Sequence, residues 1–128
     1  MDKLEYIPGD LVKFATNTYT IVNFEENFLH NKICYALIST NSTKTALVAD
    51  RDILPIPLTP EILEKNGWKV SSECRWIYVK EDNVKIFRLL DDIHYAAYIG
   101  FVRLLEFQHI HQLQHLLFGL GLNSEMEV

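Results

Sequence analysis

The chain has 128 residues, of which 48% are hydrophobic and 23% charged, and its formal net charge is −5. These values are typical of one ordinary globular domain, or of two small subdomains that share a core. Residues 1–58 carry a net charge of −2 (five basic, seven acidic) and residues 59–128 one of −3 (seven basic, ten acidic). Neither half is basic, which argues against a broad surface for nucleic acid.

The first ten residues, MDKLEYIPGD, contain no apolar run of signal-peptide length, and no segment has 18 uninterrupted apolar residues. The sequence therefore predicts no membrane span and a cytoplasmic location. Cys34 and Cys74 form no metal-type pair. We expect them to be reduced, buried and unreactive, because a thiol in apolar surroundings keeps its proton.

The N-terminal part of the chain reads as a series of short strands. Runs of β-branched and aromatic residues alternate with breaks rich in Asn, Ser and Thr, which is the residue chemistry of turns. The expected strands are 9–14, 19–24, 32–40 and 45–49. Their spacing of about ten residues is typical of a small antiparallel barrel, and we predict an SH3-like barrel over residues 1–54.

A proline-rich connector and a short helix follow. Pro55 and Pro57 favour extended backbone and cannot donate to a central ladder. Thr59 is a good N-cap, and Asn66 with the following glycine supplies a left-handed stop. The pattern predicts a helix over 60–66 that is too short to be stable alone and must therefore pack against the rest of the domain.

The remaining residues predict an antiparallel meander that ends in a helix. Breaks of two or three residues permit only hairpin neighbours. Gly100 alone is a weaker break and is also compatible with a bulge in one bent strand. The expected elements are strands 74–80, 84–90, 93–99 and 101–107, a helix over 109–120, and a short edge strand in the tail EMEV. Together with the connector these form a second subdomain, 55–128, and the fold class is α+β.

Two segments resemble a group of small uncharacterised proteins of Bacteroides-type gut bacteria, many of them encoded by prophages or other mobile elements. DILPIPLTPEILEKNGW (52–68) carries the group's "LTPEILEKNG" signature. The closing segment HIHQLQHLLFGLGLNSEMEV (109–128) is the second block, in which IHQLQ (110–114) occupies the place of the group's "VHxLQ"-like helix. The two blocks cover about 37 residues. The resemblance implies a shared fold and a bacterial or phage origin, and it implies no activity.

The candidate chemistry lies in HIHQLQH (109–115), which holds three of the five histidines. At 100° per residue, His111 and His115 fall on the side of the helix away from its apolar face, four residues apart, whereas His109 falls within the apolar arc. A zinc protease helix needs H-E-x-x-H, and Gln112 occupies the glutamate position here. A metal site on His111 and His115 would also need another ligand, and Glu106 and His94 are the candidates.

The structural interpretation of this segment is favoured, with His111 and His115 solvated and only His109 partly buried. No other constellation for catalysis or cofactor binding is present: the sequence has no phosphate-binding glycine loop and no G-x-S-x-G. Asp91 and Asp92 are best explained by a tight turn, because aspartate bonds its own turn backbone.

Three functional hypotheses remain. The leading one is a non-enzymatic accessory or interaction protein of a phage or mobile element, with a protein as its partner. The alternative is a nucleic-acid-associated SH3-like module that uses local basic residues, namely Lys32, Lys44 and Arg51. The second alternative is a metal-dependent enzyme that uses His111 and His115.

Overall fold

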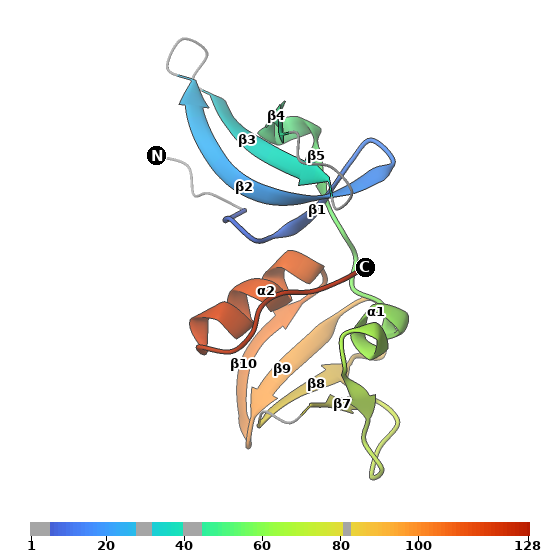
Figure 1. Ribbon diagram of the computed structural model, residues 1–128. Helices are drawn as coiled ribbons and strands as arrows, with labels where there is room; N and C mark the ends of the chain where they lie inside the picture. The colour runs from blue at the N-terminus through green and yellow to red at the C-terminus, as the bar shows by residue number, and fades with distance from the viewer. Residues whose placement is uncertain (1–5, 28–31, 40–44, 81–82) are drawn as a thin grey trace.

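The computed structural model describes residues 6–27, 32–39, 45–80 and 83–128. It contains two five-stranded antiparallel sheets, stacked one above the other with a helix between them (Figure 1). The α+β class is therefore confirmed, with strands making up most of the regular structure.

The N-terminal sheet has the strand order β4-β3-β2-β1-β5. Its strands are β1 (Leu11–Phe14), β2 (Asn17–Asn27), β3 (Lys32–Ser39), β4 (Thr45–Ala49) and β5 (Ile53–Pro55), with the 3-10 turn η1 (Asp50–Asp52) before β5. The sequence predicts the first four strands. It misses β5, whose three residues are too few for a periodic pattern, and Pro55 fits there because β5 is an edge strand.

The sheet is open along its edges. Strand β2 has a register shift between Ile21 and Asn23 where it pairs with β3, and such a bulge bends and twists a strand. Among the described residues β4 pairs only with β3, and β5 only with β1. The closed barrel predicted for residues 1–54 is not formed by these pairings, because no ladder joins the two edge strands.

The chain leaves β5 through the connector and enters helix α1 (Pro60–Lys65). The Oγ1 atom of Thr59 accepts a hydrogen bond from the Ile62 amide at 3.3 Å, which confirms the predicted N-cap. Leu63 is fully buried and anchors the helix on the second sheet. The expected end of the helix is correct to one residue, since Asn66 is its C-cap.

The C-terminal sheet is a simple meander in the order β10-β9-β8-β7-β6. Its strands are β6 (Lys69–Val70), β7 (Ile77–Val79), β8 (Val84–Arg88), β9 (Tyr95–Ile99) and β10 (Val102–Phe107). The meander is confirmed, and within this sheet only the two-residue β6 is not predicted from the sequence. Gly100, with a φ of 58°, lies in a tight turn between β9 and β10 rather than in a bulge.

Helix α2 (Ile110–Gly119) lies between the two sheets (Figure 1). Its apolar face, with Ile110, Leu113 and Leu117, belongs to the core cluster of the C-terminal sheet. Leu11 of β1 belongs to the same cluster, whereas its neighbour Val12 belongs to the core of the N-terminal sheet. Strand β1 is therefore covered on both faces, and it joins the two cores.

The tail after α2 does not add the expected edge strand. Instead, the amide of Asn66 holds it against the end of α1: the Asn66 side chain donates to the Glu127 carbonyl at 2.8 Å and accepts from the Glu127 N–H at 2.8 Å. The Asn66 side chain therefore bonds both the N–H and the C=O of Glu127, as a neighbouring strand would do. No helix in the described part of the chain is long and apolar enough to cross a membrane.

Candidate functional site

The histidine segment forms the start of α2, and its first turn is fixed by Gln112. The Gln112 Oε1 atom accepts hydrogen bonds from the backbone amides of Gln108, at 3.0 Å, and His109, at 2.9 Å. The amides at the start of an α-helix have no acceptor within the helix, and the Gln112 side chain supplies an acceptor here. The residue that replaces the catalytic glutamate of a zinc protease motif therefore has a structural role here.

His111 is buried, with 3% of its surface exposed, so the prediction that it is solvated is wrong. Its ring lies against Tyr6, with centroids 4.9 Å apart. The reason for the error is that α2 has two covered faces, and the one opposite the apolar face packs against the N-terminal sheet. Burial, together with the neighbouring rings of His115 and His109, lowers the pKa of His111 from 6.5 to about 4.

His115 is hydrogen-bonded to Asp10, a residue that the sequence pattern does not single out. The His115 Nε2 atom lies 2.6 Å from the Asp10 Oδ2 atom, and the Asp10 carboxylate also accepts from the Ile7 amide at 2.9 Å. Burial raises the pKa of Asp10, while the bonds from Ile7 and His115 oppose that shift. The pair links α2 to the turn before β1.

Gln114 also connects the halves, and its side chain is buried. Its Oε1 atom accepts from the Leu11 amide at 2.9 Å, and its Nε2 atom donates to the Gly9 carbonyl at 3.0 Å and the Ser124 carbonyl at 3.1 Å. Since buried backbone groups need partners, Gln114 satisfies backbone units of β1 and of the tail.

The structure does not assemble the candidate metal site. His115 is engaged by Asp10, and Glu106 pairs with Arg103 at 2.6 Å on the side of the C-terminal sheet away from α2. His94 pairs with Asp91 at 2.6 Å in the loop before β9. Within the described ranges, no three His, Cys, Asp or Glu side chains form a group that could hold a metal ion.

The loop that contains His94 is the Asp91–Asp92 turn. The Asp91 carboxylate accepts from the backbone amides of Ile93 and His94, at 3.0 Å and 2.9 Å. These bonds and the His94 ring lower the pKa of Asp91 to about 2. The turn interpretation of the paired aspartates agrees with this geometry.

The cysteines and the basic residues of the N-terminal half lie apart from this segment. Cys34 and Cys74 are free thiols and are half-buried rather than fully buried. Of the three cations proposed for a nucleic-acid site, Arg51 is exposed in η1. Lys44 lies outside the described residues, and the Lys32 side chain is not described.

A second candidate surface is the face of the C-terminal sheet that points away from both helices. Strand register places one side chain from each strand in a row across the sheet, and the next row begins two residues along. The first row is Lys69, Val79, Lys85, Tyr98 and Arg103. The second row is Ile77, Phe87, Ala96 and Glu106. We call these nine residues the open face.

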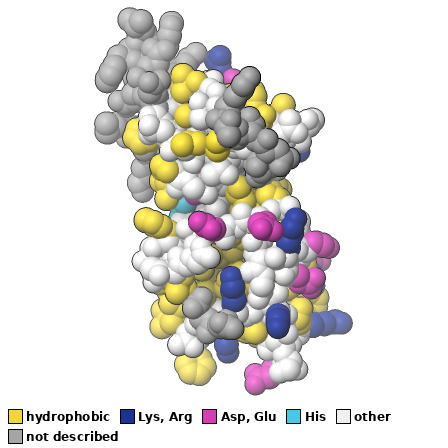
Figure 2. Space-filling model, viewed as in Figure 1, with side chains coloured by type: hydrophobic (Ala, Val, Ile, Leu, Met, Phe, Trp, Pro, Cys, Tyr) yellow, Lys and Arg dark blue, Asp and Glu magenta, His cyan; other side chains and the backbone are white. Residues whose placement is uncertain are grey.

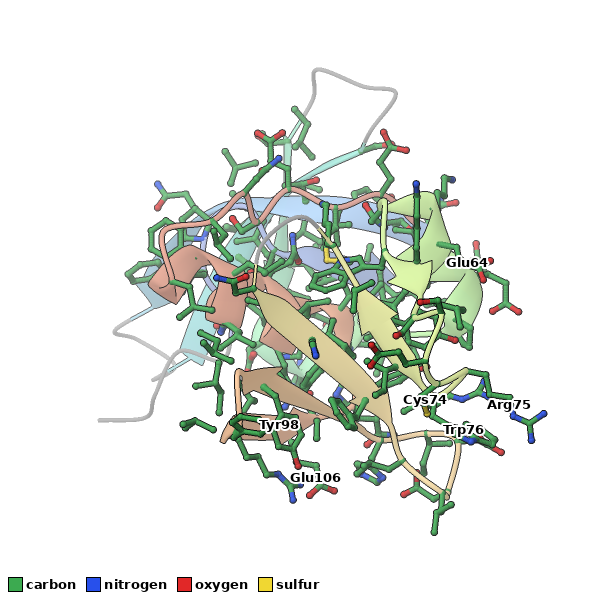
Figure 3. The ribbon with its side chains drawn as sticks, turned by 90° about the horizontal axis from the view of Figure 1, so that it is seen from below. Glu64, Cys74, Arg75, Trp76, Tyr98 and Glu106 are labelled. Carbon is green, nitrogen blue, oxygen red and sulfur yellow. The ribbon has the colours of Figure 1, made fainter. Side chains whose placement is uncertain are left out.

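The open face combines exposed cations with half-buried aromatic rings. Lys69, Lys85 and Arg103 are exposed, whereas Tyr98 and Phe87 are half-buried and lie in contact, with ring centroids 4.6 Å apart and planes tilted by 44°. Viewed from below, Tyr98 and Glu106 project side by side from the side of the sheet away from α2 (Figure 3).

Two features border the open face. An open depression of about 490 Å³ adjoins the first row, and its lining includes Val79 and Lys85 and adds Lys80. Next to Ile77 in the chain, Trp76 has two guanidinium groups near its ring, those of Arg75 and Arg88, at 4.9 Å and 4.7 Å from its centroid. Arg75 and Trp76 are labelled in Figure 3. Cation–π contacts of this kind hold an aromatic ring and a cation together.

The open face cannot be recognised in the sequence, because its members come from five strands and are spread over 38 positions, from Lys69 to Glu106. Only the register brings them together. Comparison with family models, with curated proteins and with solved structures finds no match to this chain. The arguments about function therefore rest on the geometry of these two surfaces.

Proposed function

We propose that this chain is a non-enzymatic binding protein, and that it acts as an accessory protein of a phage or mobile element in the bacterial cytoplasm. The resemblance of two segments to proteins of that origin supports the second part. The non-enzymatic role is supported by the use of the histidine segment: His111, Gln114 and His115 form contacts between the two halves of the protein, and Gln112 bonds the first turn of α2.

One observation carries the binding role. The open face presents aromatic and cationic side chains together on a rigid sheet, and none of the described helices covers it. Aromatic residues and arginine are the side chains enriched in binding surfaces. The ligand surface that we propose is therefore on the C-terminal sheet.

The finer fold assignment of the N-terminal sheet belongs to the same proposal. An SH3-like path is supported by the order β4-β3-β2-β1-β5, in which β1 lies between β2 and β5, and by the 3-10 turn before β5. In our proposal this sheet is a support, which positions α2 and the C-terminal sheet.

Immobilised protein incubated with a cytoplasmic extract of a Bacteroides-type host tests the binding role. We expect the wild type and Arg51→Glu to retain the same components, and Lys85→Glu to lose them. The two variants make the same change of charge at exposed positions, one outside the open face and one on it. The proposal is wrong if the wild type retains nothing above empty beads, or if all three proteins retain the same components.

A further inference from the structure

The open face has the opposite charge balance to the chain that carries it. Its nine residues include three cations, Lys69, Lys85 and Arg103, and one acid, Glu106, so its net charge is +2 on a chain of −5. In the front view, Lys and Arg side chains over the C-terminal half lie among Asp and Glu side chains, so the excess of positive charge belongs to the open face and not to the whole half (Figure 2). A positive surface attracts anionic ligands. Because the rest of this acidic protein repels anions, an anionic ligand is directed to the open face.

We infer that the open face binds single-stranded nucleic acid, with bases stacked on Tyr98 and Phe87 and with phosphates contacted by Lys69, Lys85 and Arg103. This inference rests on the proposed binding function and names its ligand. It moves the nucleic-acid hypothesis from the N-terminal to the C-terminal sheet.

The spacing of the cations suits an extended polyanion. Neighbouring strands lie about 4.8 Å apart, so the first row spans roughly 19 Å, with Lys69, Lys85 and Arg103 on alternate strands at intervals of about 10 Å. Arg103 is already paired with Glu106, and a phosphate would compete with that exposed carboxylate for the guanidinium. Lys69 and Lys85 have no acidic partner among the described side chains of the open face.

The aromatic pair occupies the middle of this line of charge. Tyr98 lies between Lys85 and Arg103 in the first row, and Phe87 is its diagonal neighbour in the second. Both rings are half-buried, so each keeps an exposed surface while its other side is held by the sheet. Aromatic rings on a sheet between basic residues form a stacking platform for unpaired bases.

The small area of the open face favours single-stranded nucleic acid over a folded protein as its ligand. Two rows across five strands cover roughly 250 Å², by strand spacing and rise per residue. A standard protein interface needs about 800 Å² from each partner. A few nucleotides of single strand fit the smaller area. A duplex does not, because its bases are stacked on one another and cannot reach the rings.

Fluorescence anisotropy of the full chain tests the inference. The probes are a labelled 12-nucleotide oligothymidylate, the corresponding oligouridylate, a duplex of the same length, and a labelled oligoglutamate as an anion without bases. With three phosphate contacts, affinity for single strands should fall about 20-fold between 50 and 200 mM salt. For Lys85→Gln, with one contact fewer, the fall should be about sevenfold.

The ring is tested by a matched pair of variants. Tyr98→Phe keeps the ring and should keep the affinity, whereas Tyr98→Ala removes the stacking surface and should weaken binding on the order of tenfold or more. Arg51→Glu serves as the control outside the open face. Melting temperatures show which variants are folded, and Lys85→Gln, at an exposed position, keeps the test decisive if Tyr98→Ala unfolds.

Three outcomes overturn the inference. The first is no binding of single strands at 50 mM salt with protein at about 100 μM. The second is equal binding of oligoglutamate, unaffected by Tyr98→Ala, which would make the ligand an acidic protein. The third is binding that Arg51→Glu abolishes and Lys85→Gln does not. In the extract experiment, retention that depends on Lys85 but survives nuclease treatment would leave the binding function standing and remove nucleic acid as its ligand.

Discussion

The two sheets have the same number of strands but are stabilised differently. Among the described residues, fourteen buried side chains form the core of the C-terminal sheet and seven form that of the N-terminal sheet. The C-terminal sheet has α1 and α2 on one face and leaves the other open, whereas the described part of the N-terminal half contributes no helix longer than a 3-10 turn and its sheet is contacted by α2. We therefore expect the C-terminal sheet to be the more stable half and the N-terminal sheet to depend on it through α2.

The largest expected effect is the loss of stability when a buried leucine is truncated to alanine, and the same truncation in each sheet compares the two cores. Leu113→Ala should reduce the free energy of unfolding by about 2–5 kcal/mol, because it empties a fully buried position between α2 and the larger core. Leu37→Ala, also fully buried, should fall at the lower end of that range, since the smaller core collapses more easily around the cavity. Urea titrations measure both, and an equal or larger loss for Leu37→Ala would contradict the comparison.

The contact between the halves should respond to pH. Because the pKa of His111 is about 4 in the folded protein and 6.5 in the unfolded chain, the unfolded chain binds the extra proton between those values. The free energy of unfolding should therefore fall as pH falls from 6.5 to 4, by about 3 kcal/mol from this residue. Denaturation at several pH values checks this.

Two variants isolate the source of that dependence. His111→Phe keeps a ring against Tyr6 and should remove the fall in stability. The raised pKa of Asp10 acts in the opposite direction, because the folded protein holds that proton to a higher pH than the unfolded chain does. Asp10→Asn should therefore make the fall steeper, and an unchanged slope in both variants would show that the junction does not titrate.

Gln114 tests whether the N-terminal sheet needs α2. Gln114→Leu preserves much of the side-chain volume but leaves the buried Leu11 amide without its acceptor, at a cost of about 1–3 kcal/mol. Hydrogen exchange should show faster exchange at β1 and its neighbours, with the C-terminal sheet still protected. Uniform acceleration over both sheets would mean that they unfold as one unit.

The smallest effects concern two turns with matching backbone. Ala15, between β1 and β2, has a φ of 55°, and Gly100, between β9 and β10, has a φ of 58°. Ala15→Gly should stabilise the protein and Gly100→Ala destabilise it, each by about 1 kcal/mol or less, because only glycine adopts this region without strain. A Cβ at Gly100 meets nothing within 4 Å, so no clash would obscure the comparison. Melting curves with effects of the same sign would contradict it.

The sequence predicts features that depend on neighbouring residues, such as helix ends, and misses contacts between residues that are far apart in the chain. Thr59 and Asn66 mark the ends of α1 correctly because caps depend on a few adjacent residues. The prediction for the outer face of α2 is wrong, because a helical projection identifies only an apolar face and the second buried face of α2 is polar. His111 and Gln114 lie on that face, and the partner of Gln114 in β1 is 103 residues away. The open face was missed for the same reason, since it exists only in the register of five strands.

The hydrogen bond between Leu11 and Gln114 also has a consequence during translation, because its two residues are synthesised at different times. Ribosomes add about 5–20 residues per second, so β1 is synthesised roughly 5–20 s before the glutamine that completes it. During that interval the face of the N-terminal sheet that carries Leu11 is not covered by α2. Exposed apolar surface on an incomplete sheet is what promotes aggregation and attracts chaperones. The yield of this protein in cells should therefore depend on how quickly its last quarter is translated.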